Sequence, residues 1–289
     1  MTPPATDINA QTQFCGVIGN PVEHSLSPAI HNAAFRTLGL NFVYLAWRVE
    51  AIGDAIKGLR ALGNFRGASV TIPHKVATVP FLDDLESTAR HIGAINTIVS
   101  DAGKLKGYNT DATGALRALR EGGVGLKGQR VVMLGSGGAA RAIAFALAAE
   151  GAIDRLVLLG IDKKERDALA GDLRSKTAIA VDHRHLDEDS LKQELANAQV
   201  LIHCTPTGMS PKVEETCVPS SHLHADLAVM DIVYNPRETR LLKDAKVAGC
   251  RTIPGLEMFL HQAAAQFELW TNRPAPTEVM RAVLESRFS

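Results

Sequence analysis

The chain has 289 residues, which is enough for two modest domains that each bury a core. The 31 lysines and arginines balance the 31 aspartates and glutamates, so the net charge of +0 provides no overall attraction to nucleic acid or to an anionic membrane. No run of residues approaches the ~18 apolar positions that a membrane helix needs. We therefore expect a soluble protein whose partner is a small molecule, with no nucleic-acid or membrane partner.

Cysteine spacing gives no indication of a metal site. The four cysteines, Cys15, Cys204, Cys217 and Cys250, are scattered without zinc-ligand spacing. This usage is typical of reduced thiols in a cytoplasmic protein, and we expect no metal. Residues 1–13 are polar and lack the apolar core of a signal peptide, so they are predicted to form a loose tail.

The first third of the chain alternates short apolar runs with amphipathic segments. Runs rich in β-branched and aromatic residues predict strands, and apolar residues repeated at helical spacing predict helices. The predicted strands span residues 14–18, 42–49 and 69–72, and the predicted helices span 28–38 and 52–62. This alternation indicates an α/β layer.

A second alternating series begins near Lys127. Its strands are continuously apolar, as in a parallel sheet covered on both faces by helices, which is the Rossmann arrangement. Strands are predicted over residues 130–134, 155–159, 199–203 and 228–233, and helices over 138–149 and 164–174.

An amphipathic helix is predicted over residues 256–270, directly after a Pro-Gly pair. Because the second series already has its alternating units, we assign this helix to the first domain. The predicted fold is α/β with two domains: a discontinuous substrate-binding domain of residues 1–110 plus 256–289, and a Rossmann dinucleotide-binding domain of residues 111–255. The active site is expected in the cleft between the two domains.

A glycine-rich turn follows the strand predicted over 130–134 and opens the next helix. It reads Gly135-Ser136-Gly137-Gly138-Ala139-Ala140 and fits the G-x-G-x-x-G/A fingerprint. In such a turn, backbone N–H groups approach a pyrophosphate at the helix N-terminus, which carries partial positive charge. The alternative is a tight turn without a ligand, but the strand before it and the helix after it favour a dinucleotide site.

Polar clusters in the first domain are candidates for substrate binding. Ser25 and Ser27 precede Pro28 at a predicted helix start, where free N–H groups and two hydroxyls suit a carboxylate. Plain helix capping by Ser27 is the alternative. The segment 69–75 runs from a strand through a proline to Lys75, which can exchange a proton with a substrate hydroxyl where burial lowers its pKa. A solvated surface lysine is the alternative there.

Two further clusters contain short amides and hydroxyls. The segments Gly93-Ala94-Ile95-Asn96-Thr97 and Gly107-Tyr108-Asn109-Thr110-Asp111 are also consistent with ordinary turns. Asp111 comes just before an amphipathic helix that leads to the glycine-rich domain, so we expect it to face Lys75 across the cleft. A carboxylate there would favour the ammonium form of Lys75 and accept a hydrogen bond from substrate.

These four clusters, in this order and followed by the glycine-rich turn, resemble the shikimate and quinate dehydrogenase family. The resemblance extends to Cys204-Thr205-Pro206-Thr207-Gly208-Met209, to Asp231-Ile232-Val233-Tyr234-Asn235-Pro236, and to Pro254-Gly255 and Gln262. It runs from about Phe14 to Trp270, which is nearly the whole chain. It implies reversible hydride transfer between a ring carbinol and a nicotinamide ring, without a metal.

The resemblance also implies roles for individual residues. Lys75 and Asp111 are the implied catalytic pair, with Lys75 as the proton carrier. The expected substrate-binding residues are Ser25, Ser27, Ser69, Thr71, Asn96, Tyr234 and Gln262. The expected cofactor-binding residues are Gly135, Gly137, Gly138, Ala139, Asp162, Thr205, Val233 and Gly255.

Two positions depart from the family pattern. Ser69 stands where biosynthetic members usually carry asparagine before the Val-Thr pair, which leaves its hydroxyl recognition open. Members that use NADP commonly follow the second Rossmann strand with Asn-Arg-Thr, whereas this chain has Leu159-Gly160-Ile161-Asp162-Lys163-Lys164. Asp162 lies where an acidic side chain meets the ribose 2′-OH and repels a 2′-phosphate, so NAD is the expected cofactor. NADP stays open, because Lys163 and Lys164 can neutralise a phosphate and Asp162 can be a helix cap.

The expected function is that of a catabolic quinate/shikimate dehydrogenase, which oxidises shikimate to 3-dehydroshikimate and quinate to 3-dehydroquinate with NAD. An NADP-dependent biosynthetic shikimate dehydrogenase that reduces 3-dehydroshikimate is the alternative, and an aminoshikimate enzyme is less favoured. A non-catalytic ligand sensor is disfavoured, because it would not need both Lys75 and Asp111. The oligomeric state, monomer or homodimer, stays open.

Overall fold

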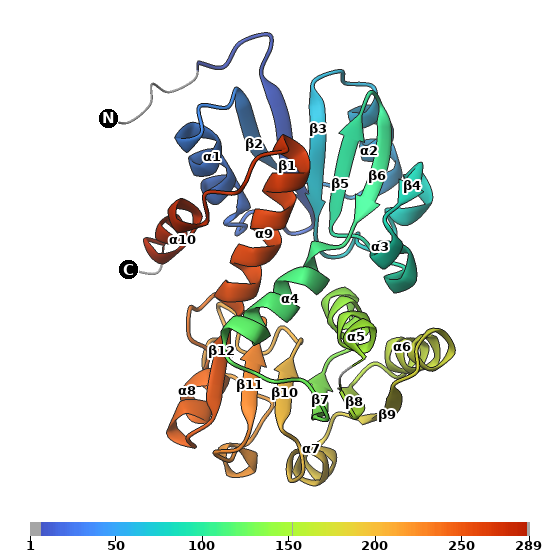
Figure 1. Ribbon diagram of the computed structural model, residues 1–289, viewed down its shortest axis with the longest axis vertical. Coiled ribbons are helices and arrows are strands. Elements are labelled where there is room, and N and C mark those ends of the chain that lie inside the picture. The colour runs from blue at the N-terminus through green and yellow to red at the C-terminus, as the bar shows by residue number, and fades with distance from the viewer. Residues whose placement is uncertain (1–6, 152, 288–289) are drawn as a thin grey trace. The chain divides into compact units, whose positions relative to one another are not determined.

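The structure is a computed structural model that describes residues 7–151 and 153–287. It divides into two compact units, Met1–Thr110 with Gln262–Ser289 and Asp111–His261 (Figure 1). Helices α4 (Thr110–Glu121) and α9 (Gly255–Thr271) contain the positions at which the chain passes from one unit to the other. Residues 1–6 of the predicted tail lie outside the described residues.

The first unit is built on a six-stranded mixed sheet in the order β2-β1-β3-β5-β6-β4. Strand β1 is parallel to β2 and β3, whereas β5 is antiparallel to β3 and β6. The strands are β1 (Gln13–Gly19), β2 (Phe42–Arg48), β3 (Phe65–Val70), β4 (Asp84–Leu85), β5 (Thr97–Asp101) and β6 (Lys104–Tyr108). The helices are α1 (Ser27–Thr37), α2 (Ile52–Arg60), α3 (Ser87–Ile92) and α10 (Thr277–Glu285), and a short 3₁₀ turn spans Val79–Phe81.

Apolar side chains from helices pack against both faces of this sheet. On one face, Ile56 of α2 joins Ile18 and Val70 in a buried cluster. On the other face, Phe35 of α1 lies 5.3 Å from Phe267 of α9, measured between ring centroids. Side chains of successive strand residues point to opposite faces, so Ser69 and Val70 of β3 face different layers.

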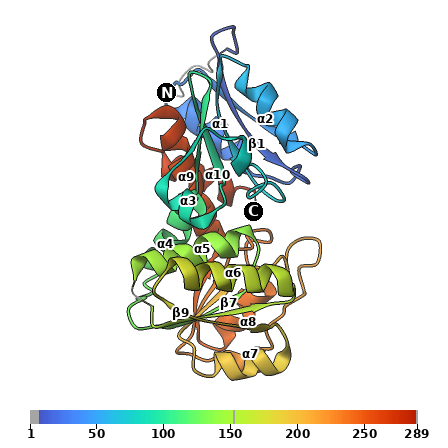
Figure 2. The same cartoon turned by 90° about the vertical axis from the view of Figure 1, so that its right-hand side faces the viewer.

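The second unit contains six parallel strands in the order β12-β11-β10-β7-β8-β9. Counted along the chain from β7, this is the Rossmann order, and helices α5 and α6 lie on one face with α7 and α8 on the other (Figure 2). The two-domain α/β fold with a Rossmann domain is therefore confirmed. The strands are β7 (Arg130–Leu134), β8 (Arg155–Gly160), β9 (Ala180–His185), β10 (Val200–His203), β11 (Ala228–Asp231) and β12 (Arg251–Pro254). The helices are α5 (Gly138–Glu150), α6 (Lys163–Lys176), α7 (Glu188–Leu195) and α8 (Arg240–Val247), and a 3₁₀ turn spans Ser220–His222.

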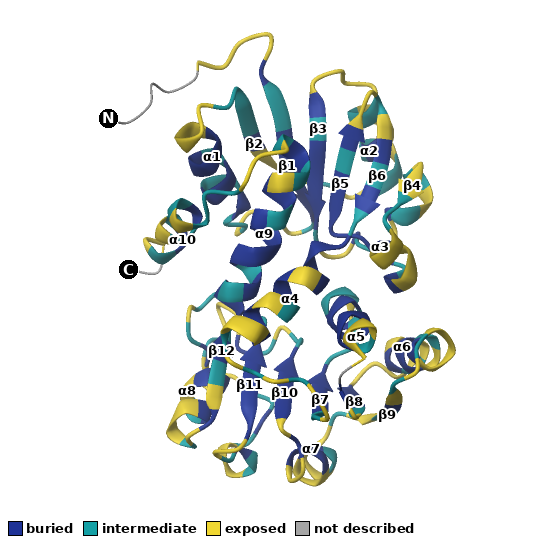
Figure 3. Ribbon diagram, in the orientation of Figure 1, coloured by how far each residue is buried: buried dark blue, intermediate teal, exposed yellow. Residues whose placement is uncertain are grey.

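The central strands of the second unit are buried, as their dark blue colour indicates (Figure 3). Leu134 of β7, Leu201 of β10 and Val229 of β11 belong to one core cluster with residues of α7 and α8. Burial of a side chain of this size contributes ~1.5–3 kcal/mol, so this core fixes the positions at which the strands end.

Some element bounds differ from the prediction. The strand predicted over 69–72 is β3, which begins at Phe65 and ends at Val70. Gly67 interrupts the apolar pattern of this strand. The structure requires glycine at this position, because a Cβ there would lie 2.3 Å from Nε1 of Trp270. The β5–β6 hairpin and the strands β9 and β12 were not predicted, since their sequences lack long apolar runs.

Among the described residues, none of the helices combines the length and the apolar character needed to cross a membrane.

Candidate active site

The serines that follow β1 lie at the start of α1. Ser27 is buried and forms the first residue of the helix, while Leu26 occupies the cap position. The Ser25 hydroxyl accepts a hydrogen bond from the Ser27 backbone N–H at 3.3 Å. The cap role considered for Ser27 is therefore wrong. The Ser27 hydroxyl instead interacts with the buried hydroxyl of Tyr44.

Ser69 of β3 lies in a buried chain of hydroxyl and amide groups. Its Oγ lies 2.6 Å from the Tyr44 hydroxyl and donates to Oε1 of Gln266 at 2.8 Å. Burial raises the pKa of Tyr44, although its hydrogen bond with Ser69 opposes the shift. Sequence reasoning missed Tyr44 and Gln266. For Gln266 a signal existed, because it lies one helical turn after Gln262 in an otherwise apolar helix.

Lys75 lies in the segment that follows β3, and its side chain is half-buried. The Lys75 carbonyl accepts a hydrogen bond from the backbone N–H of Ile95 at 2.9 Å. His74, directly before it, is buried and contacts the Val49 carbonyl through Nε2 at 2.7 Å. Thr71 begins the segment, and its carbonyl accepts from the His74 N–H. The segment is thus fixed on both sides of Lys75.

Asn96 lies in a buried hydrogen-bond network, and only 2% of its surface is exposed. Its Oδ1 accepts from the Thr110 N–H at 2.8 Å and from the Thr97 hydroxyl at 2.7 Å. Its Nδ2 donates to Oε1 of Gln262 at 3.4 Å. Two of the predicted substrate-binding residues, Asn96 and Gln262, therefore contact each other.

Asp111 lies in the first turn of α4 and is 6% exposed. Burial raises the pKa of the Cys204 thiol, and the negative charges of Asp231 and Asp111 add to this shift. The Asp111 carboxylate is therefore within electrostatic reach of the residue that follows β10. In the Rossmann order, β10 and β7 flank the point where the strand order reverses and where dinucleotides bind.

The glycine-rich turn has the geometry of a dinucleotide site. Gly135 has φ +100°, and a Cβ there would lie 2.9 Å from the Cys204 carbonyl oxygen. Gly137 caps α5, and a Cβ there would meet no atom within 4 Å, so the helix N-terminus opens to a ligand. Gly138 and Ala139 begin the helix. These residues fit the pyrophosphate of a bound dinucleotide.

The segment after β8 holds the residue predicted to select the cofactor. Asp162 caps α6, and its Oδ1 accepts from the Glu165 N–H at 2.9 Å. The neighbouring Ile161 is 74% exposed, and Lys163 pairs with Asp167 at 2.6 Å. The capping alternative for Asp162 is confirmed, while its contact with a ribose stays a prediction.

Three further predicted residues surround the ends of β11 and β12. The Val233 N–H donates to Oδ1 of Asp231 at 3.0 Å. A Cβ on Gly255 would lie 2.6 Å from the Ile232 carbonyl oxygen, so only glycine allows this close packing. Tyr234 stacks on Phe259 with ring centroids 4.6 Å apart, and burial raises the pKa of its hydroxyl.

One group of potential metal ligands exists among the described residues. Atoms of Glu121, Glu257 and His261 lie within 4.8 Å of one another. Oε1 of Glu121 accepts a hydrogen bond from Arg117 at 2.8 Å, and its Oε2 lies 3.0 Å from Nε2 of His261. The Arg117 guanidinium therefore compensates the charge of Glu121.

Comparison with known proteins identifies the family. The profile of the "Shikimate dehydrogenase substrate binding domain" matches residues 17–98, that of the "Shikimate 5'-dehydrogenase C-terminal domain" matches 255–285, and that of the "Saccharopine dehydrogenase NADP binding domain" matches 131–267. A shikimate dehydrogenase (NADP(+)) of Methanopyrus kandleri is 47% identical, over 97% of this chain and 98% of the relative. The chain belongs to the shikimate/quinate dehydrogenase family. It is accordingly an NAD(P)-dependent oxidoreductase, as the motifs implied.

Two solved structures of this dehydrogenase family resemble the chain over almost its full length. A shikimate dehydrogenase in complex with NADP⁺ has a TM-score of 0.92 and 40% identity, and the match covers 99% of each chain. The quinate dehydrogenase from Corynebacterium glutamicum in complex with NAD has a TM-score of 0.88 and 33% identity, covering 95% of this chain and 99% of that one. The family thus includes members with either substrate and either cofactor.

Proposed function

We propose that this protein is a shikimate dehydrogenase that interconverts 3-dehydroshikimate and shikimate with NADP as its cofactor. The observation that carries the proposal is the 47% identity with an NADP-dependent shikimate dehydrogenase over nearly the whole of both chains. A solved shikimate dehydrogenase with NADP⁺ bound is also more similar than the quinate dehydrogenase. On the sequence motifs alone, this function is the alternative to an NAD-linked quinate/shikimate dehydrogenase. The comparisons favour it over NAD-linked quinate oxidation.

The polar residues of the first unit suit a small polyhydroxylated acid. The Ser25 and Ser27 hydroxyls at the start of α1 are assigned to the substrate carboxylate, where the helix dipole adds favourable charge. Asn96 and Gln262 already share a hydrogen bond and are assigned to ring hydroxyls. Thr71 and Tyr234 complete the proposed set. Ser69 is buried between Tyr44 and Gln266, so we assign it a supporting contact behind this set.

The proton step is assigned to Lys75 and Asp111. When bound, NADPH would supply the hydride that reduces the carbonyl carbon of 3-dehydroshikimate, and NADP⁺ would accept it in the reverse direction. Lys75, as an ammonium group, donates the proton that converts the resulting alkoxide oxygen into a hydroxyl. Asp111 stabilises the ammonium form and accepts a hydrogen bond from substrate. In the reverse direction, Lys75 takes the proton back from the hydroxyl.

The second unit supplies the dinucleotide site. The open N-terminus of α5 at Gly137 is assigned to the pyrophosphate. Thr205 and Val233 lie at the carboxyl ends of β10 and β11, where Rossmann domains bind the remainder of the dinucleotide. Gly255 follows β12 directly and packs on the end of β11.

A second candidate is an NAD-linked dehydrogenase that oxidises shikimate and quinate, and one specific observation favours it. The exposed Ile161 and the acidic Asp162 occupy the end of β8, where the ribose 2′ position of a dinucleotide lies. A 2′-phosphate there would meet the Asp162 carboxylate. No arginine stands at positions 161–164, and the guanidinium of Arg166 in α6 is engaged by the Gly160 carbonyl at 2.7 Å.

Initial rates separate the two candidates. The purified protein is assayed with shikimate and with quinate, each with NADP⁺ and with NAD⁺ at the same concentrations. The proposal expects the highest kcat/KM with shikimate and NADP⁺. A higher kcat/KM with NAD⁺, together with turnover of quinate, supports the second candidate instead. No turnover in any of the four assays contradicts both.

A further inference from the structure

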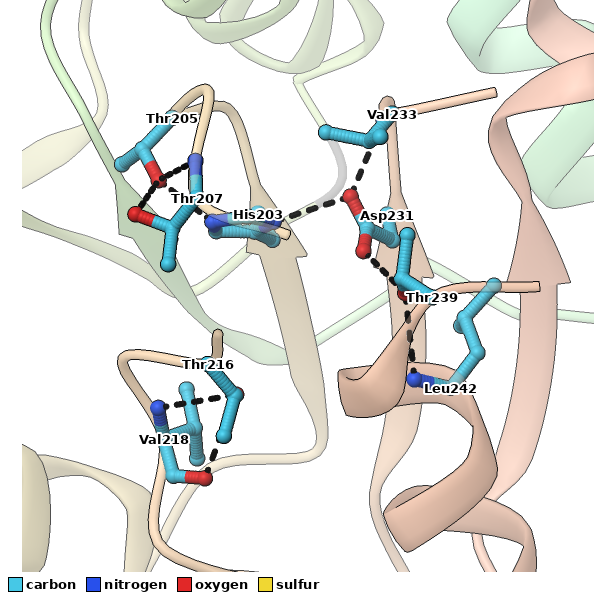
Figure 4. A network of polar contacts seen from close by, with 9 residues as sticks. All are labelled: His203, Thr205, Thr207, Thr216, Val218, Asp231, Val233, Thr239 and Leu242. Carbon is cyan, nitrogen blue, oxygen red and sulfur yellow. Dashed lines mark hydrogen bonds and ion pairs between the residues drawn. The ribbon is translucent and has the colours of Figure 1, made fainter. Parts of the chain in front are cut away.

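Strand β10 ends in a buried imidazole that the proposed reaction does not use. His203 is 1% exposed and lies at the carboxyl end of β10, beside the point where the strand order reverses. Its Nδ1 lies 2.8 Å from Oδ1 of Asp231, and its Nε2 makes a short contact with the Thr205 hydroxyl (Figure 4). Both ring nitrogens are therefore engaged.

The partner carboxylate is fixed from three sides. Oδ1 of Asp231 also accepts from the Val233 N–H, and its Oδ2 accepts from the Thr239 hydroxyl at 2.6 Å. Thr239 in turn caps α8 through the Leu242 N–H. Because the Asp231 oxygens accept the other hydrogen bonds made to them, Nδ1 of His203 carries the proton of their contact and donates a hydrogen bond to Oδ1.

The Thr205 hydroxyl determines what the other ring nitrogen does. It donates to the Thr207 hydroxyl at 3.0 Å and accepts from the Thr207 backbone N–H at 3.3 Å. A hydroxyl has one proton and two lone pairs, so its remaining lone pair suits an Nε2–H donor. The imidazolium form of His203 therefore satisfies every donor and acceptor in this chain of contacts.

The charges around the ring agree with this form. Burial alone would lower the pKa of His203, but its hydrogen bonds with Asp231 of β11 and Cys217 of the loop before the 3₁₀ turn outweigh that effect and raise the pKa to about 9. The raised pKa favours the imidazolium form, in agreement with the hydrogen-bond geometry. The Thr205 proton consequently points to Thr207, and the Thr207 hydroxyl proton points away from Thr205.

The segment that His203 holds is adjacent to the glycine-rich turn. A Cβ on Gly135 would lie 2.9 Å from the Cys204 carbonyl oxygen and 3.3 Å from Cγ2 of Thr205. The Cys204 N–H also donates to the Leu134 carbonyl at the end of β7. Any displacement of Thr205 therefore changes one wall of the turn that is assigned to the dinucleotide.

We propose that His203 is a positioning residue of the dinucleotide site, which donates through Nε2–H to Thr205 and so fixes the Thr205–Thr207 segment in its cofactor-binding conformation. The inference rests on the proposed function in one respect, namely that this protein binds a nicotinamide dinucleotide. His203 itself does not contact the dinucleotide. Its effect is transmitted through Thr205, and the Asp231 carboxylate holds the ring in place.

Two substitutions of His203 each keep one of the two hydrogen bonds that its imidazole ring makes. The amide nitrogen of His203→Asn lies near the position of Nδ1 and keeps the bond to Asp231, whereas that of His203→Gln lies near the position of Nε2 and keeps the donor to Thr205. Thr205→Val removes the acceptor from the other side. His224→Asn is the matched control. His224 lies in the segment before β11, and its Nε2 contacts the carbonyl of Leu195 rather than a residue of the Thr205–Thr207 segment.

The measurement is the Kd of NADP⁺ and of NAD⁺, obtained by isothermal titration calorimetry without substrate. We expect His203→Asn and Thr205→Val each to raise Kd about tenfold, as for the loss of one charge-assisted hydrogen bond. His203→Gln should bind more tightly than His203→Asn, and His224→Asn should match the wild type. The wild-type Kd should also rise as the pH passes about 9, whereas that of His203→Asn should not.

Wild-type Kd values for both His203→Asn and Thr205→Val would overturn the inference. If His203→Asn does not fold, as judged by circular dichroism, the pH dependence of the wild-type Kd decides, because Thr205 is itself assigned to the dinucleotide site. The outcome is distinguishable from failure of the proposed function, because the titrations contain no shikimate. A protein whose dinucleotide Kd depends on His203 in this way, but which turns over neither shikimate nor quinate, contradicts only the proposed function.

Discussion

Oδ1 of Asn96 accepts a 2.8 Å hydrogen bond from the backbone N–H of Thr110. Thr110 directly precedes Asp111 in the chain. Ile95, which directly precedes Asn96 in the chain, donates its backbone N–H to the Lys75 carbonyl at 2.9 Å. The two bonds therefore link the backbone at Lys75 to that of Thr110, which precedes Asp111, although the two residues assigned to proton transfer are 36 positions apart in the sequence.

Substitution of Lys75 tests the proton step. Lys75→Met keeps the length of the side chain and removes its proton, so we expect kcat to fall about 10²- to 10⁴-fold, with a much smaller change in KM for shikimate. Steady-state rates over a range of shikimate concentrations provide the measurement. Lys57→Met is the control, because Lys57 is exposed and its Nζ pairs with the exposed Asp54 at 3.5 Å. A change confined to KM would assign Lys75 to substrate binding instead.

The sequence predicted the elements whose pattern is local. The strand β7, the glycine-rich turn and α5 are contiguous, and the apolar run and the glycines that define them lie within a few residues of one another. The polar residues at strand ends were also recognised, because turn-forming amides and hydroxyls stand out beside apolar strands.

The residues that sequence reasoning missed depend on pairing between distant strands. Tyr44 lies in an apolar run and has the pattern of an ordinary strand residue. Its hydroxyl reaches Ser69 only because β2 pairs with β1 and β1 pairs with β3. The pairing of His203 with Asp231 likewise requires the parallel register of β10 and β11, in which these residues are direct partners. A single sequence contains no signal for either pairing.

Two glycines in the dinucleotide turn should respond differently to alanine. Gly135→Ala places a Cβ against the Cys204 carbonyl at φ +100°, so we expect the free energy of unfolding to fall by ~1–3 kcal/mol. Gly137→Ala meets no neighbouring atom and should leave stability within ~0.5 kcal/mol. Its Cβ occupies the space assigned to the pyrophosphate, so the Kd of NADP⁺ should rise at least about tenfold.

Urea denaturation and calorimetric titration of both glycine variants provide the comparison. The wild type is measured in parallel. Unchanged dinucleotide binding by Gly137→Ala would place the pyrophosphate elsewhere and would remove the main support for the α5 N-terminus as its site.

Neutralising Asp162 should shift the cofactor preference toward NADP. Asp162→Asn keeps an oxygen that accepts from the Glu165 N–H, whereas alanine would also remove the helix cap at a cost of ~1 kcal/mol. Removing the negative charge near a 2′-phosphate is worth ~1 kcal/mol in a solvated site, so the ratio of kcat/KM with NADP⁺ to kcat/KM with NAD⁺ should rise about fivefold. Asp187→Asn, which changes the equivalent cap of α7, should leave the ratio unchanged. An unaltered ratio in Asp162→Asn would restrict Asp162 to its capping role.

The buried His203 should make stability depend on pH in a specific direction. Burial opposes the charge on the ring, yet the bonds with Asp231 and Cys217 prevail and raise its folded-state pKa from 6.5 to about 9. The folded protein thus binds this proton more tightly than the unfolded chain does, and the associated stability is fully present below about pH 6.5 and is lost as the pH rises through about 9. The difference in unfolding free energy between the wild type and His203→Asn should therefore be largest at pH 6 and shrink toward pH 10. Urea denaturation at several pH values measures it, with His224→Asn as the control for a general loss of imidazole. A difference that instead grows as the pH rises from 6 to about 8 would mean that His203 is neutral in the folded protein, and that Thr205 donates its proton to Nε2 rather than to Thr207.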